Sequence, residues 1–416
     1  MILDRLRSTY REYPRPFWTL TGAHFVDRIG STALWPFFSL YITQKFDVGM
    51  TEAGLLFALF SLSSFVGSIL GGALTDRFGR KMILLFGLVA SAASGLMMGF
   101  AQDLSTFFLL AAFTGILSDV GGPAAQAMVA DLLPEGQRAE GFGVLRVTGN
   151  LAWIIGPTLG GIIGAYSFLY LFIIDAVTSL ITAGIVLLAL PETRPESQDI
   201  AHGESMTQTF RGYGKVLRDG LFVAFIGISI LMNIVYNQMY STLSVYLRDV
   251  HDVAARGYGY LMSMNALVVV LFQFPLTRRL RPYRPMTRMV AGTLLYLVGF
   301  TMYGFVGAYV MFAAAMLLIT VGEMMIIPTA SALVARLAPA AMRGRYMAVS
   351  GVTWVVSASV GPLAAGIVID NYNPNWVWYM CGLISAIAVV GYLLLDARGD
   401  PRLEAKPLVE AETAAG

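Results

Sequence analysis

Three acidic residues near the middle of long apolar stretches are candidates for chemistry. They are Asp27, Asp119 and Glu323, and Asp27 is followed directly by Arg28. An ionised group at the centre of a bilayer costs about 2.5–3.5 kcal/mol, so residues of this kind are usually retained for a function. In dry surroundings the neutral form of a carboxyl group is favoured. These acids are therefore suited to hold a proton and, once ionised, to bind a cationic substrate in its place.

The three acids differ in their sequence neighbours. Glu323 has no adjacent basic residue, which makes it the first candidate for the group where proton and substrate exclude one another. Asp119 is the second candidate. Asp27 is the third, because Arg28 can keep it ionised. Two structural alternatives stay open: a static Asp27–Arg28 ion pair, and an inter-helix hydrogen bond at Asp119.

Membrane helices must position these acids, because 56% of the 416 residues are hydrophobic and only 13% are charged. Soluble domains carry about 25% charged residues. A membrane helix needs about 20 apolar residues, and windows of this kind predict twelve spans. They are expected to begin near residues 17, 53, 82, 104, 139, 166, 220, 257, 287, 308, 344 and 375. Basic residues gather at the ends and in alternate loops, which predicts cytoplasmic termini and a cytoplasmic central loop.

The composition argues against several other classes of protein. There are 28 basic and 26 acidic residues, and the resulting net charge of +2 argues against a nucleic-acid partner. One cysteine, Cys381, and three histidines offer no ligand set for a metal centre. We find no nucleophile–base motif and no phosphate-binding loop that would indicate an enzyme. We expect no metal, no cofactor and no cleaved signal peptide.

The two halves of the chain share landmarks. Four of them, at Pro123, Pro134, Arg138 and Gly156-Pro157, recur 205 residues later as Pro328, Pro339, Arg343 and Gly361-Pro362. A repeat at one fixed offset predicts two similar six-helix bundles, with recurrence by composition as the alternative. We predict bundles over residues 1–190 and 220–396, a cytoplasmic central loop over 191–219 and a disordered cytoplasmic tail over 397–416.

The loop between the second and third predicted spans reads Gly72-Ala73-Leu74-Thr75-Asp76-Arg77-Phe78-Gly79-Arg80-Lys81. It resembles the signature loop of the major facilitator superfamily, G-x-L-x-D-R-x-G-R-K, at every specified position. The resemblance implies an all-α membrane protein with twelve transmembrane helices in two pseudo-symmetric six-helix bundles, the major facilitator fold. It also implies a gating latch in which the loop meets a carboxylate near the end of span 4; its residues here are Asp76, Arg77, Gly79, Arg80 and Asp131. A purely structural interfacial ion pair is the alternative.

The fifth predicted span resembles the antiporter signature of the same superfamily, G-x8-G-x3-G-P-x2-G-G. The matching residues are Gly143, Gly156, Pro157, Gly160 and Gly161, and Ala152 stands where the pattern has a further glycine. In the family this packing is thought to limit leak and to favour exchange, whereas generic helix packing is the alternative. The whole chain is similar to the drug:proton antiporter branch. That branch often has an arginine in span 4 where this chain has Ala111.

In this superfamily spans 1, 4, 7 and 10 line a central cavity. The resemblance therefore implies a proton-coupling and substrate cavity formed by Glu323, Asp119, Asp27, Arg28, Asn233, Tyr236, Asn237 and Tyr240. Arg146 is a candidate for the missing cavity cation, with snorkelling toward the cytoplasm as the alternative. Asp175 receives no role.

The function implied by this resemblance is secondary active transport. We expect a monomeric, multi-pass protein of the inner membrane that exchanges protons for amphipathic, often cationic drugs by alternating access. Proton-coupled transport of a defined small metabolite, such as a sugar or amino acid derivative, is the alternative. A membrane-embedded enzyme and a sensor that has lost transport are two further classes, which the motifs favour less.

Overall fold

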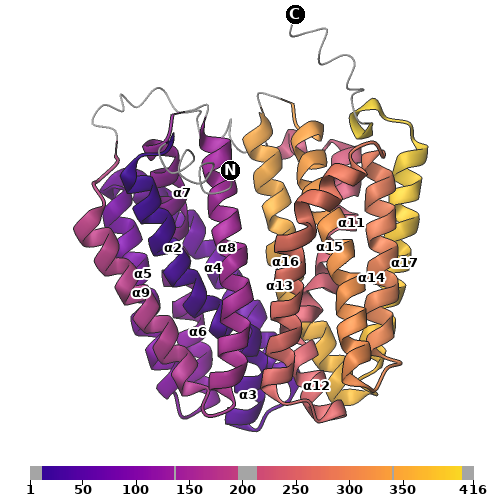
Figure 1. Cartoon of the computed structure of the whole chain (residues 1–416), viewed down its shortest axis with the longest axis horizontal. Helices are drawn as coiled ribbons and strands as arrows, with labels where there is room; N and C mark the ends of the chain where they lie inside the picture. The colour runs from indigo at the N-terminus through magenta and orange to yellow at the C-terminus, as the bar shows by residue number, and fades with distance from the viewer. Residues whose placement is uncertain (1–11, 135–136, 195–212, 340–341, 405–416) are drawn as a thin grey trace, which may run out of the picture. The chain divides into compact units, whose positions relative to one another are not determined.

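The computed structural model describes residues 12–134, 137–194, 213–339 and 342–404, and its regular secondary structure there is helical. The first half contains α2 (Arg15–Leu34), α3 (Phe38–Phe46), α4 (Met50–Phe78), α5 (Arg80–Phe100), α6 (Leu104–Asp119), α7 (Gly121–Leu132), α8 (Arg138–Gly164) and α9 (Leu169–Ala189). The second half contains α11 (Gly220–Ser241), α12 (Leu243–His251), α13 (Ala255–Leu280), α14 (Pro285–Tyr303), α15 (Tyr309–Leu337), α16 (Arg343–Asn371) and α17 (Trp376–Ala397). Figure 1 shows their order along the chain.

The helices confirm the predicted membrane fold. Within the described residues, ten helical segments are long and apolar enough to cross a bilayer, one of them formed by α6 and α7 together. The two remaining predicted spans correspond to α2 and α14, which carry charges at Asp27, Arg28 and Arg288. Every helix at a predicted span begins within three residues of its expected start.

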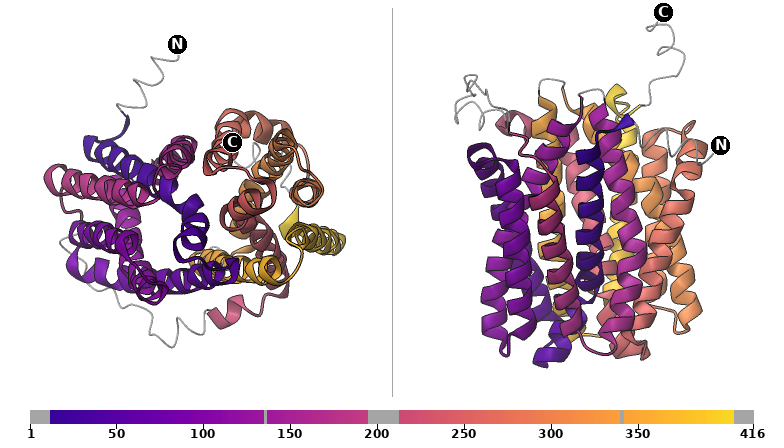
Figure 2. Two further views of the ribbon diagram at one scale, coloured as in Figure 1. Left: turned by 90° about the horizontal axis from the view of Figure 1, so that it is seen from below. Right: turned by 60° about the vertical axis from the view of Figure 1, so that its left-hand side comes forward.

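Proline and glycine set the main breaks in these helices. The first predicted span is interrupted at the 3-10 turn Trp35–Phe37, because Pro36 has no backbone N–H to donate. The α4–α5 turn requires Gly79, whose φ is +94°, in a region that side chains disfavour. Figure 2 shows that the helices of each half run roughly parallel to one another.

The chain forms two compact units. Unit 1 consists of Met1–Asp199, Met239–Val270 and Pro362–Asp370, and unit 2 of Ile200–Gln238, Leu271–Gly361 and Asn371–Gly416. Unit 1 therefore contains the first-half helices together with the end of α11, all of α12, the first part of α13 and the last turns of α16. The division into bundles over 1–190 and 220–396 stays a prediction.

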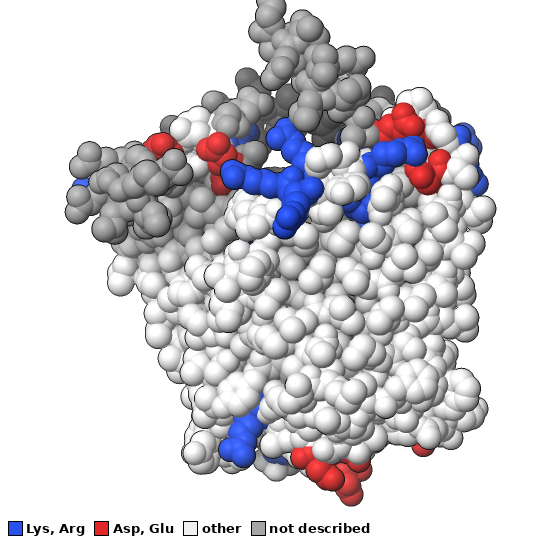
Figure 3. Space-filling model, turned by 45° about the vertical axis from the view of Figure 1, so that its right-hand side comes forward, with Lys and Arg blue, Asp and Glu red and all other residues white. Residues whose placement is uncertain are grey.

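Charged side chains lie near the two ends of the molecule on the face shown in Figure 3. The wide band between the two rims carries almost none of them on this face. Large apolar side chains such as Ile69, Leu109 and Leu188 are exposed. An uncharged band with exposed apolar side chains is the surface expected where lipid replaces water.

The end of the chain differs in part from the predicted disordered tail. Residues Pro401–Leu403 form a 3-10 helix, and Leu403 is buried. Arg402 anchors this segment, because its guanidinium bonds both Asp219 and Asp400 at 2.9 and 3.0 Å. The sequence prediction missed this turn because a short charged segment can be ordered by distant ion-pair partners. Residues 405–416 lie outside the described part of the chain.

Candidate functional site

Asp27 faces a neighbouring helix of unit 1. Its Oδ1 accepts a hydrogen bond from the hydroxyl of Ser179 on α9 at 2.8 Å. One turn along α2, a methyl group added at Gly30 would lie 2.9 Å from the Cα of Asp175, so α2 and α9 pack tightly here. Asp175, to which the sequence assigned no role, therefore lies on the same interface as Asp27. Two acids and a hydroxyl share this junction between two membrane helices.

The side chain of Arg28 bonds to a residue other than Asp27. Its Nε donates to Nε2 of His24 at 3.4 Å, and within the described residues no ion pair joins it to Asp27. Its positive charge acts electrostatically on both Asp27 and Asp119. Arg28 is thus the basic group near two of the predicted acids. The static ion pair that the sequence left open is not the arrangement seen.

Asp119 is the last residue of α6, directly before the break that leads to α7. It lies beside Ser64 of α4 and within the electrostatic reach of Arg28. The break therefore places a carboxyl group at the junction of α4, α6 and α7. The structure puts Asp27, Arg28 and Asp119 together in unit 1.

Glu323 is half-buried midway along α15 in unit 2. Its neighbour Gly322 faces α14, where an added methyl group would lie 2.7 Å from the Tyr296 ring. Tyr236 of α11 stacks on Tyr296, with ring centroids 6.1 Å apart and planes within 3°, and Trp354 of α16 lies 6.3 Å from Tyr236. The segment of α15 that carries Glu323 therefore packs on an aromatic cluster through Gly322, and aromatic faces attract organic cations.

The polar residues predicted on span 7 fall into both units. In unit 2, Asn233 donates to Thr353 of α16 at 3.2 Å, and Asn237 donates to the carbonyl of Asn233 at 3.0 Å. Tyr240 belongs to unit 1, where its ring packs edge-on against Trp153 at 5.1 Å. That all these residues share one cavity with Glu323 and Asp119 stays a prediction.

The predicted contact of the signature loop with Asp131 is present. Nε of Arg80 donates to Oδ2 of Asp131 at 3.0 Å, and the two side chains are 7% and 23% exposed. The hydroxyl of Thr193 donates to the same oxygen at 3.3 Å. The side chain of Asp76 lies outside the described part of the structure. This ion pair ties the signature loop to the end of α7.

Glu192 is a functional candidate that the sequence reasoning missed. Its two carboxylate oxygens accept the first backbone N–H groups of α5, from Arg80 at 2.9 Å and Lys81 at 3.1 Å. A methyl group added at Gly79 would lie 2.6 Å from Oε2 of Glu192. Gly79 is thus required both for its backbone conformation and for the space that the carboxylate occupies.

The surroundings of Glu192 favour its charged form. Partial burial opposes ionisation, but backbone N–H groups of Arg80, Arg194, Lys81 and Thr193 outweigh it, so the pKa of Glu192 is lowered. Nearby, Arg194 donates to the carbonyl of Arg77 at 3.0 Å. One feature of the sequence could have identified Glu192: it is an acidic residue directly after Pro191, at the end of the sixth predicted span.

The antiporter-like glycines of α8 pack against two helices. Gly156 lies against Thr32 and Gly160 against Ala33 of α2. The hydroxyl of Thr32 donates to the carbonyl of Ala152 at 3.1 Å, so the glycine-to-alanine departure is compatible with the contact. On the other side, Gly161 approaches the backbone of α13, where an added methyl group would lie 2.9 Å from the Cα of Arg256.

Two residues of span 5 do not take part in this packing. Among the residues that the structure describes, no atom of another element lies within 4 Å of the position a Cβ would take at Gly143, so this glycine makes no close contact with a described helix. Arg146 is exposed on α8.

A comparison of the chain with models of protein families agrees with this helical architecture. The model of the major facilitator superfamily matches residues 20–362 and, in a second match, 289–415. The chain belongs to the major facilitator superfamily. It is 28% identical over 390 residues to the uncharacterized transporter YttB of Bacillus subtilis, with 92% of this chain and 96% of that protein covered.

Two relatives of this major facilitator protein have more informative names. A Na(+), Li(+), K(+)/H(+) antiporter of Planococcus maritimus is 25% identical over 415 residues, covering 92% of this chain and 96% of its own. The multidrug resistance protein MdtH of Shigella dysenteriae is 24% identical over 402 residues, covering 94% and 92%. The solved nucleoside transporter NupG has the same fold, with a TM-score of 0.80 at 13% identity over 92% of this chain and all of its own.

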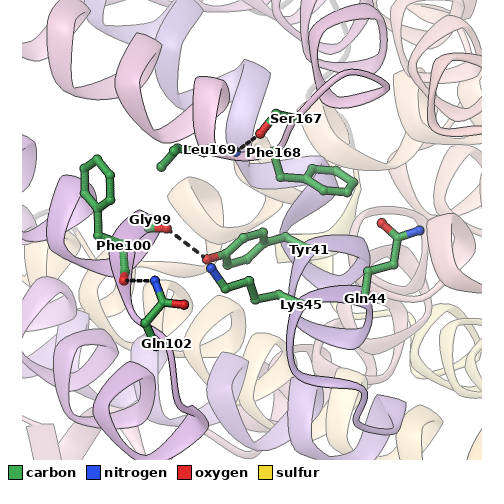
Figure 4. A pocket seen from close by; sticks show the side chains of 9 residues that line it. All are labelled: Tyr41, Gln44, Lys45, Gly99, Phe100, Gln102, Ser167, Phe168 and Leu169. Carbon is green, nitrogen blue, oxygen red and sulfur yellow. Dashed lines mark hydrogen bonds between the residues drawn. The ribbon is translucent and has the colours of Figure 1, made fainter.

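A pocket of about 410 Å³ in unit 1 lies away from the predicted cavity residues of this major facilitator protein. It is lined by Tyr41, Gln44, Lys45, Gly99, Phe100, Gln102, Ser167, Phe168 and Leu169. Figure 4 shows the Tyr41 hydroxyl donating to the carbonyl of Gly99 at 3.4 Å. The same hydroxyl lies 3.3 Å from the carbonyl of Met98. None of its lining residues is an acid or one of the predicted site residues.

Proposed function

We propose that this protein is a proton-coupled antiporter that exports lipophilic, often cationic compounds by alternating access. The observation that carries the proposal is Glu323, an acid midway along a membrane helix and next to residues that pack on stacked aromatic rings. A proton on the carboxyl group and a cation at the carboxylate exclude one another. Aromatic faces add attraction for organic cations of about 0.5–2 kcal/mol.

Exchange rather than uniport is supported by the close packing of α8. Its glycines bring the helix against α2 on one side and α13 on the other, and small residues at such contacts leave little room for leak. Two relatives whose names include "antiporter" and "multidrug resistance" point the same way. Both are below 30% identity, so they support the class of transport and do not identify the compound.

We also propose that the protein acts as a monomer in the inner membrane with both termini cytoplasmic. The support is the distribution of basic residues, since the loops expected on the cytoplasmic side hold most of the arginines. On this orientation the α4–α5 loop and the central loop face the cytoplasm. The Arg80–Asp131 pair would then be a latch on the cytoplasmic side.

The test is transport by purified protein in liposomes with an imposed pH gradient and a fluorescent lipophilic cation. Wild-type protein should accumulate the cation against its gradient. Glu323→Gln should lose at least 90% of the gradient-driven uptake, because the amide cannot exchange a proton for a cation. Glu12→Gln is the matched control, since Glu12 is exposed and precedes the first membrane helix, and it should transport normally.

Full gradient-driven uptake by Glu323→Gln would remove Glu323 from the coupling role. No uptake by wild-type protein of any cation in a panel of chemically different dyes would contradict drug export. Uptake of a labelled sugar or amino acid derivative instead would favour the metabolite alternative.

Antiport of alkali cations is a second candidate function. It is favoured by the α2–α9 interface, where Ser179 donates to Asp27 and the backbone of Asp175 lies against Gly30, and by the name of one relative. Oxygen ligands suit hard cations. The same liposomes with Na⁺ or K⁺ inside and a pH-sensitive dye decide it: cation-dependent proton movement that Asp175→Asn abolishes would support this candidate over drug export.

A further inference from the structure

The first turn of α4 is capped by a residue from the other half of the chain. Its N-cap residue is Gly49, which has no side chain with which to cap the helix. Asp370, next to the end of α16, fills this position: Oδ1 accepts the N–H of Met50 at 2.9 Å and Oδ2 accepts the N–H of Thr51 at 2.7 Å. All of these residues belong to unit 1.

Three glycines make room for this cap. A methyl group added at Gly49 would lie 2.5 Å from Oδ2 of Asp370, and one added at Gly54 would lie 2.5 Å from the Cα of Leu363. From the other side, Gly366 of α16 packs directly on the carbonyl of Met50. The first turn of α4 and the last turns of α16 therefore approach backbone to backbone.

Other pairs join the two halves at the same end of unit 1. Thr158 of α8 donates to Ser263 of α13 at 2.6 Å, and Arg248 of α12 donates to Thr43 of α3 at 3.0 Å. Both are single hydrogen bonds. The Asp370 contact differs because one carboxylate meets two backbone N–H groups at the positive end of a helix dipole, which is the strongest arrangement of the three.

We propose that Asp370 is a conformational lock that holds the α3–α4 end of the transporter closed and must release α4 in each transport cycle. The inference rests on the proposed function, because alternating access requires the two halves to separate at this end. When the end opens, the N–H groups of Met50 and Thr51 lose the carboxylate and must be solvated instead. The closed state is therefore favoured as long as Asp370 keeps its two bonds.

The test measures the opening of this end directly. Gln44 and Asn373, both exposed and close in sequence to the two partners, are replaced by spin-labelled cysteines in a Cys381→Ser background. Pulsed electron paramagnetic resonance then gives the populations of short and long label distances. In Asp370→Ala the ratio of long to short distances should rise about 3- to 30-fold, which is the usual effect of losing a helix N-cap.

Two further variants keep the test independent of any folding defect. Gly49→Ala retains the acid but places a methyl group against it, and should shift the populations in the same direction. Asp252→Asn is the matched control, since Asp252 is exposed on α12's C-terminal turn with φ +54°, which asparagine tolerates. It should leave the distances unchanged.

Unchanged distances in both Asp370→Ala and Gly49→Ala would overturn the lock. The proposed function fails separately, through the uptake assay on wild-type protein. A population shift in a protein that shows no proton-driven uptake would keep the lock and reject the transport proposal. Normal uptake with no population shift would keep the transport proposal and reject the lock.

Discussion

Two helices of unit 1 begin in the same way and are capped from different parts of the chain. Helix α5 follows Gly79 and is capped by Glu192, whereas α4 follows Gly49 and is capped by Asp370. Glu192 comes from the segment after α9, in the same half as α5. Asp370 comes from the second half. The same chemistry thus stabilises one half internally in the first case and joins two halves in the second.

The backbone at the two glycines shows the difference. Gly79 has φ +94°, a conformation that side chains disfavour, while Gly49 has φ −75°, which any residue adopts. The α5 cap is therefore built into the turn that precedes it. The α4 cap needs only space, so its carboxylate can leave without distorting the chain. We expect disruption of the first to lower stability and disruption of the second to change the balance between conformations.

The largest effect is expected for Gly79→Ala. The variant combines a disfavoured backbone conformation with a contact of 2.6 Å to Glu192, and it should lower the free energy of unfolding by about 1–3 kcal/mol. Thermal melts in detergent measure this loss. Gly49→Ala should lose clearly less, and equal losses in the two variants would contradict the proposed difference.

A smaller effect is expected for Glu192→Gln. The amide keeps one acceptor oxygen but loses the charge, and because Glu192 is exposed the loss should be about 0.5–1 kcal/mol at pH 7. The pKa of Glu192 is lowered in the folded protein, so its contribution is present above the unfolded value of about 4.3 and is lost as the pH falls through the folded value. In thermal melts from pH 7 downward, the stabilities of the wild type and the variant should converge in acid. A constant difference would show that the charge of Glu192 does not stabilise the fold.

The smallest effect is expected at the matching turn of the second half. The position 205 residues after Gly79 is Arg284, followed by Pro285, which has no N–H to cap. Arg284 instead pairs with Asp396 and Glu404 at 3.3 and 2.9 Å, about half-exposed. Arg284→Ala should therefore cost at most about 0.5 kcal/mol, and less in high salt. A loss as large as that of Gly79→Ala would show that this turn is also a structural cap.

The spans could be predicted because a run of about 20 apolar residues has few other uses, as Leu169–Ala189 and Trp376–Ala397 show. The contact between Arg80 and Asp131 followed from a family motif. The caps could not be predicted, since each carboxylate and its helix are more than a hundred positions apart. In the sequence, Glu192 looks like a solvated charge in a loop. Asp370 looks like a charge that only marks the end of a membrane span. Nor does sequence distance reveal that Asp175 lies beside Asp27.

Helix α4 runs unbroken from Met50 to Phe78, without a proline. Its 29 residues make a rod about 43 Å long. Asp370 caps the first end of this helix. The second end continues through Gly79 into α5, whose first turn is capped by Glu192. If a rigid helix of this length tilts by about 5° about its first end, its second end is displaced by about 4 Å. If Asp370 releases α4 as proposed above, we expect the turn anchored by Glu192 at the other end of the helix to move with it.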